Sequence, residues 1–96
     1  MKDVTYRVEA EADLDGIYDH SVERWGAAQA DRYVTDIRSR IAGLATGMTA
    51  SRSVAELRPG LRRALAGRHV VFFREDAARI VVVRVLHQGM DVGRVE

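Results

Sequence analysis

The sequence contains no cysteine. This absence excludes disulfides, thiolate nucleophiles and zinc–thiolate sites together, and it is compatible with a reducing compartment. Any metal site would have to be built from the three histidines, His20, His69 and His87. No two of these are closely spaced on one predicted element, so we expect neither a metal site nor a cofactor.

Long apolar runs are also missing from the chain. No segment approaches the roughly 20 apolar residues that a membrane-spanning helix requires. The first residues carry Asp3 and Glu9 within an alternating pattern, which differs from the apolar core of a signal peptide. We therefore expect a cytoplasmic protein without a membrane partner.

Lysine is rare, because the chain contains one lysine and fourteen arginines. Its formal net charge is +1. That net value hides an asymmetry, because residues 52–74 contain six arginines and a single acid, Glu56. A compositional bias explains the excess of arginine over lysine but not this clustering. Solvated faces, a nucleic-acid surface and a docking site for an acidic protein are the three possible interpretations. We favour the acidic protein, because nucleic-acid recognition usually joins such charge to exposed aromatics, whereas Phe72 and Phe73 lie in an apolar strand where at least one should be core.

Two segments show helical periodicity. Apolar residues recur three, four or seven positions apart over residues 11–25, and a second stripe covers residues 30–47, which predicts two amphipathic helices. Gly26 lies between them, where glycine permits a sharp reversal, so the helices should form a hairpin. We expect Trp25 to pack in the core. We expect the acidic residues of the first helix to point mostly to solvent: Asp13, Asp15 and Asp19.

Strand patterns lie on both sides of this hairpin. Val4, Tyr6 and Val8 alternate with polar residues, and three further strand-like runs follow late in the chain, the last of which is nearly continuous in β-branched residues. The late runs cover residues 61–65, 69–74 and 79–87, and the small and polar residues 47–55 read as a loop.

The order of these elements predicts an α+β fold of the type βααβββ, in which a helical hairpin packs on one face of a small, mainly antiparallel sheet. We expect one domain spanning residues 1–96, with the other sheet face partly open. A chain of this length buries a smaller share of its surface than a large protein does. A stabilising partner is therefore plausible from size alone.

Several motifs resemble those of the ParE branch of the ParE/RelE superfamily of small bacterial toxins. They are Arg24-Trp25-Gly26, Leu57-Arg58-Pro59-Gly60 and Arg84-Val85-Leu86-His87-Gln88. The resemblance implies a toxin of a type II toxin–antitoxin system that inhibits DNA gyrase by binding and is neutralised by a ParD-like antitoxin. The chain departs from the family where the first helix begins, because it lacks the usual Ser or Thr cap followed by proline. The apolar stripe alone places the helix start near Glu11.

His87 is the residue most suited to catalysis, since imidazole acts as an acid or a base near neutral pH. The residues after His87 contain no tyrosine or lysine and only Arg94 as a basic group, whereas many RelE-type nucleases have a terminal catalytic aromatic. We expect His87 to cap or hydrogen-bond a strand end, and we expect no catalytic residue. A RelE-like ribosome-dependent mRNA endonuclease remains the alternative, and a nontoxic module that only binds antitoxin is a third possibility.

The candidate binding residues divide into two sets. The basic segment supplies the candidates for antitoxin binding: Arg58, Arg62, Arg63, Arg68 and Arg74. The resemblance implicates the carboxyl-terminal region in toxicity, which supplies the candidates for target binding: His87, Met90, Asp91 and Arg94. No specific binding of nucleic acid by this protein alone is expected.

Overall fold

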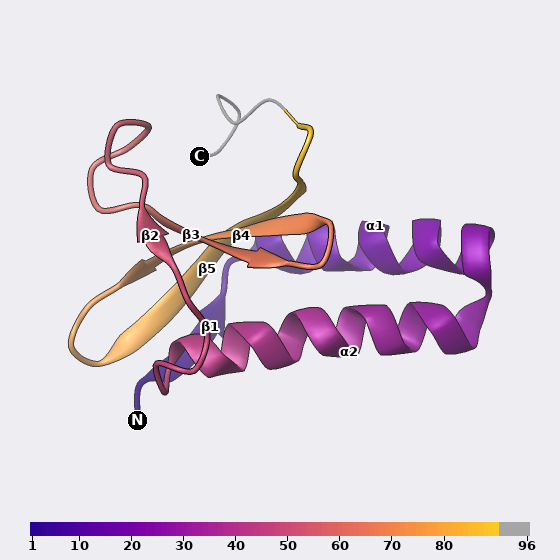
Figure 1. The fold of residues 1–96 in the computed structure, drawn as a ribbon, viewed down its shortest axis with the longest axis horizontal. Coiled ribbons are helices and arrows are strands. Elements are labelled where there is room, and N and C mark those ends of the chain that lie inside the picture. Colours follow the sequence, from indigo (N-terminus) through magenta and orange to yellow (C-terminus); the bar gives the residue numbers. More distant parts are fainter. Residues whose placement is uncertain (91–96) are drawn as a thin grey trace.

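The structure, a computed structural model, describes residues 1–90 of the chain. Two helices and five strands follow one another in the order strand, two helices and four strands (Figure 1). Their bounds are β1 Asp3–Tyr6, α1 Val8–Trp25, α2 Ala27–Leu44, β2 Arg52–Ser53, β3 Arg62–Ala66, β4 His69–Glu75 and β5 Arg79–His87. The predicted α+β class and the order of the main elements are confirmed.

The five strands form one sheet in the order β1-β5-β4-β3-β2. β1 runs parallel to β5, and the other neighbouring pairs are antiparallel. β2 falls within the segment predicted as a loop, where its two residues pair with Arg62 and Arg63 of β3. Two residues are too few to produce a readable alternation, so the sequence gives no sign of this strand.

The first helix begins at Val8, three residues before the predicted start at Glu11. Val8 continues the alternation of the first strand in sequence, yet its side chain is 82% exposed and belongs to the helix. Arg7 occupies the capping position without a side-chain hydrogen bond to the helix. Glu9 and Glu11 lie in the first turn, where their charge is favourable next to the amino-terminal end of the helix dipole.

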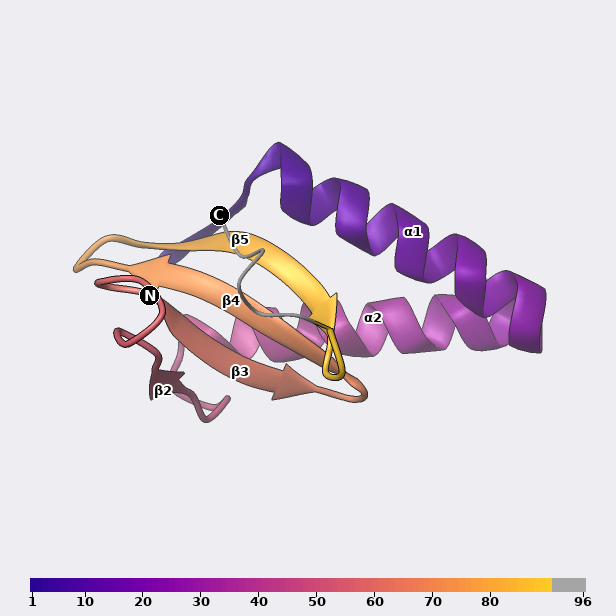
Figure 2. The ribbon, with the colours of Figure 1, turned by 90° about the horizontal axis from the view of Figure 1, so that it is seen from above.

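The helical hairpin turns at Gly26, as predicted. This single residue separates α1 from α2 and has a φ of 87° and a ψ of 166°, a combination that side-chain-bearing residues rarely adopt. The second helix ends at Leu44, somewhat before Gly47. The two helices lie over one face of the sheet (Figure 2).

The sheet separates two apolar clusters. The larger cluster lies between the helices and the sheet and includes Leu14, Ile41 and Phe73. The smaller one lies on the opposite face, where Phe72 packs with residues of the segment 54–61. All six buried members of the smaller cluster are at most 4% exposed, so the prediction of a partly open outer face is wrong around them. The irregular segment covers that face and has no periodicity that sequence reasoning could use.

Neither helix of the described residues is long and apolar enough to cross a membrane.

Candidate functional site

An ion pair fastens the first helix to the last strand. The Asp13 carboxylate accepts hydrogen bonds from Nε and Nη2 of Arg84 at 2.7 and 2.9 Å, and from the backbone N–H of Val85 at 2.9 Å. The hydrogen bonds to Asp13 raise the pKa of Arg84 above its ordinary value. The expectation that Asp13 faces solvent is therefore wrong.

The position of this ion pair follows from the sheet topology. β1 pairs with β5 only as far as Val82, after which the chain turns into α1. The edge of β5 beyond Val82 has no neighbouring strand on that side, and Asp13 supplies the acceptor that a strand would otherwise provide for Val85.

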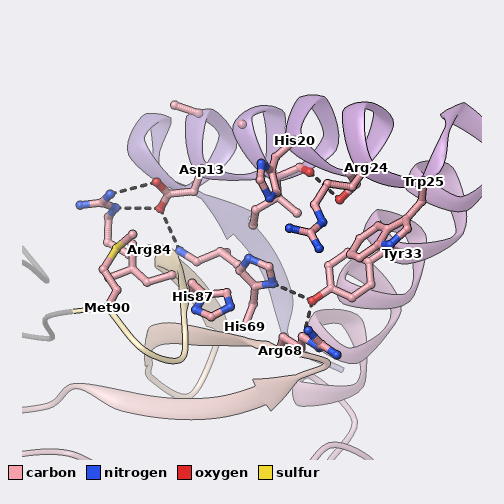
Figure 3. A pocket seen from close by; sticks show the side chains of 16 residues that line it. Asp13, His20, Arg24, Trp25, Tyr33, Arg68, His69, Arg84, His87 and Met90 are labelled. Carbon is pink, nitrogen blue, oxygen red and sulfur yellow. Dashed lines mark hydrogen bonds and ion pairs between the residues drawn. The ribbon is translucent and has the colours of Figure 1, made fainter.

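Next to the ion pair a pocket of about 520 Å³ opens between α1, the β3–β4 hairpin and the end of β5 (Figure 3). Its lining includes His20, Arg24 and Trp25 from α1, Tyr33 from α2 and several residues of the sheet. The strands contribute His69, Arg84 and His87, among others, while Arg68 comes from the β3–β4 turn and Met90 from the segment after β5. This volume is in the range of small-molecule sites, roughly 300–1,000 Å³.

His69 and His87 meet in the pocket because they are register partners across β4 and β5. Their rings contact edge to face, with 5.5 Å between centroids. Burial, followed by the charges of His87 and His20, lowers the pKa of His69 from 6.5 to about 4. His69 is consequently neutral at physiological pH.

The hydroxyl of Tyr33 joins the second helix to this histidine pair. It accepts a hydrogen bond from the backbone N–H of Arg68 at 3.0 Å, and it lies 2.6 Å from Nδ1 of His69. His69 is the one remaining partner of the hydroxyl among the described residues, so we assign the hydroxyl proton to the bond with Nδ1. Gly67 permits this approach, because a Cβ at that position would lie 2.9 Å from Tyr33.

The ring of His87 is fixed by the backbone that follows β5. The backbone N–H of Gly89 donates to Nδ1 of His87 at 3.2 Å, so the predicted hydrogen-bonding role of His87 at a strand end is confirmed. In both histidines Nδ1 accepts a hydrogen bond, so the N–H of the neutral His69 ring lies on Nε2.

Trp25 is 49% exposed at the rim of the pocket, so its predicted place in the core is wrong. It is the last residue of α1, and its ring lies 6.4 Å from that of Tyr33 and 5.6 Å from Cζ of Arg24. The apolar stripe of the first helix predicts that Trp25 lies on the same helix face as the core residues. It does not predict that the sheet ends before the tip of that helix.

The predicted antitoxin-binding arginines do not form one patch. Arg62 bonds to Ser51 and forms an ion pair with Glu75 at 3.5 Å, while Arg74 donates to the carbonyl of Pro59 at 2.6 Å. Arg58 lies in the same irregular segment as Pro59.

Arg63 and Arg68 occupy two further places. Arg63 lines a shallow hollow beside Leu65 at the outer edge of β3. Arg68 lies in the turn between β3 and β4, and its side chain lines the pocket together with His87 and Met90. Arg68, which is predicted to bind the antitoxin, thus lies beside His87 and Met90, which are predicted to bind the target.

Of the predicted target-binding residues, His87 and Met90 lie together at the pocket, whereas Asp91 and Arg94 fall outside the described residues. Sequence reasoning missed Tyr33 and the convergence of His69 with His87. Tyr33 carries no signal of its own, because it belongs to the apolar stripe of α2. In residues 1–90 no group of three or more potential ligands that could hold a metal ion occurs.

The fold and the pocket define a small α+β domain with a helical hairpin and a donor-rich surface site. Comparison with known proteins gives its family. The pattern of the family described as "ParE toxin of type II toxin-antitoxin system, parDE" matches residues 4–92. The chain belongs to this family, which confirms the resemblance seen in its motifs.

Individual relatives agree with the family match. Toxin ParE1 of Mycobacterium tuberculosis is 42% identical over 86 residues, which is 88% of each chain. Toxin ParE1 of Caulobacter vibrioides is 38% identical over 91 residues, covering 95% of this chain and 94% of that protein. A solved structure of the chromosomal ParDE system from P. aeruginosa superposes with a TM-score of 0.76 at 29% identity, over 91% of this chain and 96% of that one.

Proposed function

We propose that this toxin inhibits DNA gyrase by binding it, without catalysis, and that a ParD-like antitoxin neutralises it. The family match supports the toxin–antitoxin role. The solved ParDE structure supports an antitoxin of the ParD type as the partner. Gyrase as the target rests on the resemblance of the motifs to ParE toxins.

The observation that carries the non-catalytic part is the hydrogen bonding of the histidine pair. Cleavage of a phosphodiester by two imidazoles needs one ring to accept a proton and the other to donate one. Nδ1 of His69 is bonded to Tyr33 and Nδ1 of His87 is bonded to Gly89. Each ring therefore presents an N–H donor to the pocket and no free lone pair, which suits binding rather than proton abstraction.

A supercoiling assay with purified gyrase tests this function. We expect loss of supercoiling and accumulation of cleaved DNA as the toxin is added, and reversal when the antitoxin is present. Alanine at His87 or Met90 should weaken inhibition without unfolding the protein, because both side chains are exposed. Met48→Ala is the matched control, since Met48 is 85% exposed and does not line the pocket. Unchanged gyrase activity at saturating toxin would refute the proposal.

The same histidine pair favours one second candidate, a ribosome-dependent mRNA endonuclease. A tautomer change in His69 or His87 would free a lone pair for general base catalysis. Codon-specific cuts in translated mRNA that disappear in His87→Ala would establish this activity. Intact mRNA at toxin concentrations that stop supercoiling would exclude it.

We propose that an acidic antitoxin contacts the basic segment at several places: Arg58 in the irregular segment before β3, Arg62, Arg63 and Arg74 on β3 and β4, and Arg68 at the pocket. We expect Arg58→Gln combined with Arg63→Gln to weaken binding of an acidic antitoxin about tenfold, with a larger loss at low salt because screening is then weaker. Arg32→Gln combined with Arg79→Gln is the charge-matched control, because both arginines are exposed and neither belongs to the predicted antitoxin-binding set. Equal losses in both proteins would contradict a localised site.

A further inference from the structure

Four rings form a continuous wall along the pocket beside α1. Their centroids are 6.4 Å apart for Trp25 and Tyr33, 5.6 Å for Tyr33 and His69, and 5.5 Å for His69 and His87. Trp25 is half-exposed at the outer end of this wall. An exposed indole next to a hollow offers a stacking surface for a planar ligand.

Hydrogen-bond donors dominate the polar lining. Arg24 and Arg68 both line the pocket, and neither guanidinium takes part in an ion pair within residues 1–90. His69 and His87 add two N–H groups, because their Nδ1 atoms are already bonded. Figure 3 shows Arg24 extending from α1 toward the space between His20 and Tyr33.

Free oxygen acceptors are lacking among the side chains of the same lining, although the imidazole of His20 can accept a hydrogen bond as well as donate one. Asp13 is its single carboxylate, and it is used by Arg84 and Val85. The Ser21 hydroxyl is buried and donates to the carbonyl of Ile17 at 2.7 Å. A ligand must therefore bring acceptors rather than donors, as an anion does. A peptide backbone fits less well, because it carries an N–H donor for nearly every carbonyl.

We propose that this pocket binds a nucleoside monophosphate, with the base stacked on Trp25 and the phosphate held by Arg24 and Arg68. Guanidinium groups form strong charge-assisted hydrogen bonds with phosphate, and a base can stack on an indole whatever its hydrogen-bonding edge. A volume of about 520 Å³ accommodates a ligand of this size. The site is an addition to gyrase inhibition and does not depend on it.

Trp25 also provides the measurement, since it is the single tryptophan of the chain. Its fluorescence is followed while the full-length toxin is titrated with AMP, with adenosine or with inorganic phosphate. We expect saturable quenching by AMP, with at least tenfold weaker binding of adenosine and of phosphate, because each supplies only half of the contacts. AMP binding no tighter than that of either half would overturn the proposal.

Two variants test the phosphate contacts separately from folding. Arg24→Gln and Arg68→Gln should each weaken AMP binding about tenfold and leave the melting temperature unchanged. Adenosine binding should be unchanged in Arg68→Gln, whereas Arg24→Gln also alters the stacking surface, because Cζ of Arg24 lies 5.6 Å from the centroid of the Trp25 ring. Arg32→Gln, outside the pocket, should bind AMP as the wild type does. AMP affinity that is equal in all four proteins would overturn the site, even if quenching is observed.

A mononucleotide can be free or can form the phosphorylated end of a nucleic-acid strand. Repeating the titration with a 5′-phosphorylated trinucleotide separates these sources. Binding of AMP alone supports a free nucleotide, whereas equal or tighter binding of the trinucleotide, lost in Arg24→Gln, supports a strand end. Failure of both ligands would exclude the nucleotide site, and the gyrase assay would remain an independent test of the toxin activity.

Discussion

Replacing His69 with glutamine should remove a specific part of the acid sensitivity of this toxin. In the folded protein burial and the neighbouring charges of His87 and His20 hold the pKa of His69 at about 4, against 6.5 for a free histidine. Glutamine does not titrate. The variant therefore loses the ionisable ring while it keeps a polar side chain at this position.

The direction in which stability changes with pH follows from proton linkage. Above pH 6.5 the ring is neutral in both the folded and the unfolded chain, so His69 has no effect on how stability varies with pH. As the pH falls from about 6.5 to 4, the unfolded chain takes up a proton that the folded chain does not, and stability is lost. A shift of this size would correspond to ~3 kcal/mol for a fully buried ring. Since the ring is only half-buried, solvent screening reduces our expectation to ~1–2 kcal/mol.

Urea unfolding followed by circular dichroism at several pH values between 7.5 and 4.5 measures this loss. The free energy of unfolding of the wild type should fall ~1–2 kcal/mol more than that of His69→Gln over this interval. Carboxylates such as Asp76 titrate equally in both proteins and cancel in the difference. Proton NMR of the imidazole resonances gives the midpoint of His69 directly. Parallel stability curves, or a His69 midpoint near 6.5, would refute the reasoning.

Three further substitutions test the fold around the site by urea or thermal unfolding. Asp13→Asn should cost ~2 kcal/mol, because it weakens the hydrogen bonds to Arg84 and Val85, whereas Asp15→Asn on the exposed side of α1 should change stability little; equal effects would contradict the role of the ion pair. Gly26→Ala should cost ~1–3 kcal/mol through strain at a φ of 87°, and an unchanged melting temperature would show that the hairpin relaxes. Phe73→Ala should lose ~3–5 kcal/mol by leaving a cavity in the larger core, and a loss below ~1 kcal/mol would mean that the core collapses around it.

The sequence predicts the helices and main strands because their apolar periodicity matches the final burial. It fails where the decisive geometry is the alignment of two strands. Strands over residues 69–74 and 79–87 joined by a four-residue loop would place His69 opposite Arg84. In the structure β4 continues to Glu75 and a bulge shifts the register in its middle, so that His69 faces His87. Neither the length of a hairpin loop nor a bulge can be read from apolar patterning, and the histidine pair depends on both.

The site was predictable in part for the same reason. His87 and Met90 are named from a recognisable motif, and the structure places both at the pocket, while their role in target binding stays a prediction. Tyr33 and Trp25 were misjudged or missed, since an apolar stripe does not distinguish a residue facing the core from one facing a hollow. The smaller apolar cluster shows the opposite case. The segment that covers Phe72 packs there, although its sequence has no apolar pattern that would predict this.

The pocket residues divide by what each side chain bonds to, and this division should separate function from folding. Asp13 and Tyr33 connect the helices to the sheet through hydrogen bonds, so changes there should alter stability and activity together. His87 and Met90 are exposed and lie at the pocket, so changes there should alter gyrase binding with little effect on folding. A protein that acts by occupying a surface should show this second class of variants, folded and antitoxin-bound but unable to stop gyrase, because its activity resides in exposed contacts that the core does not require.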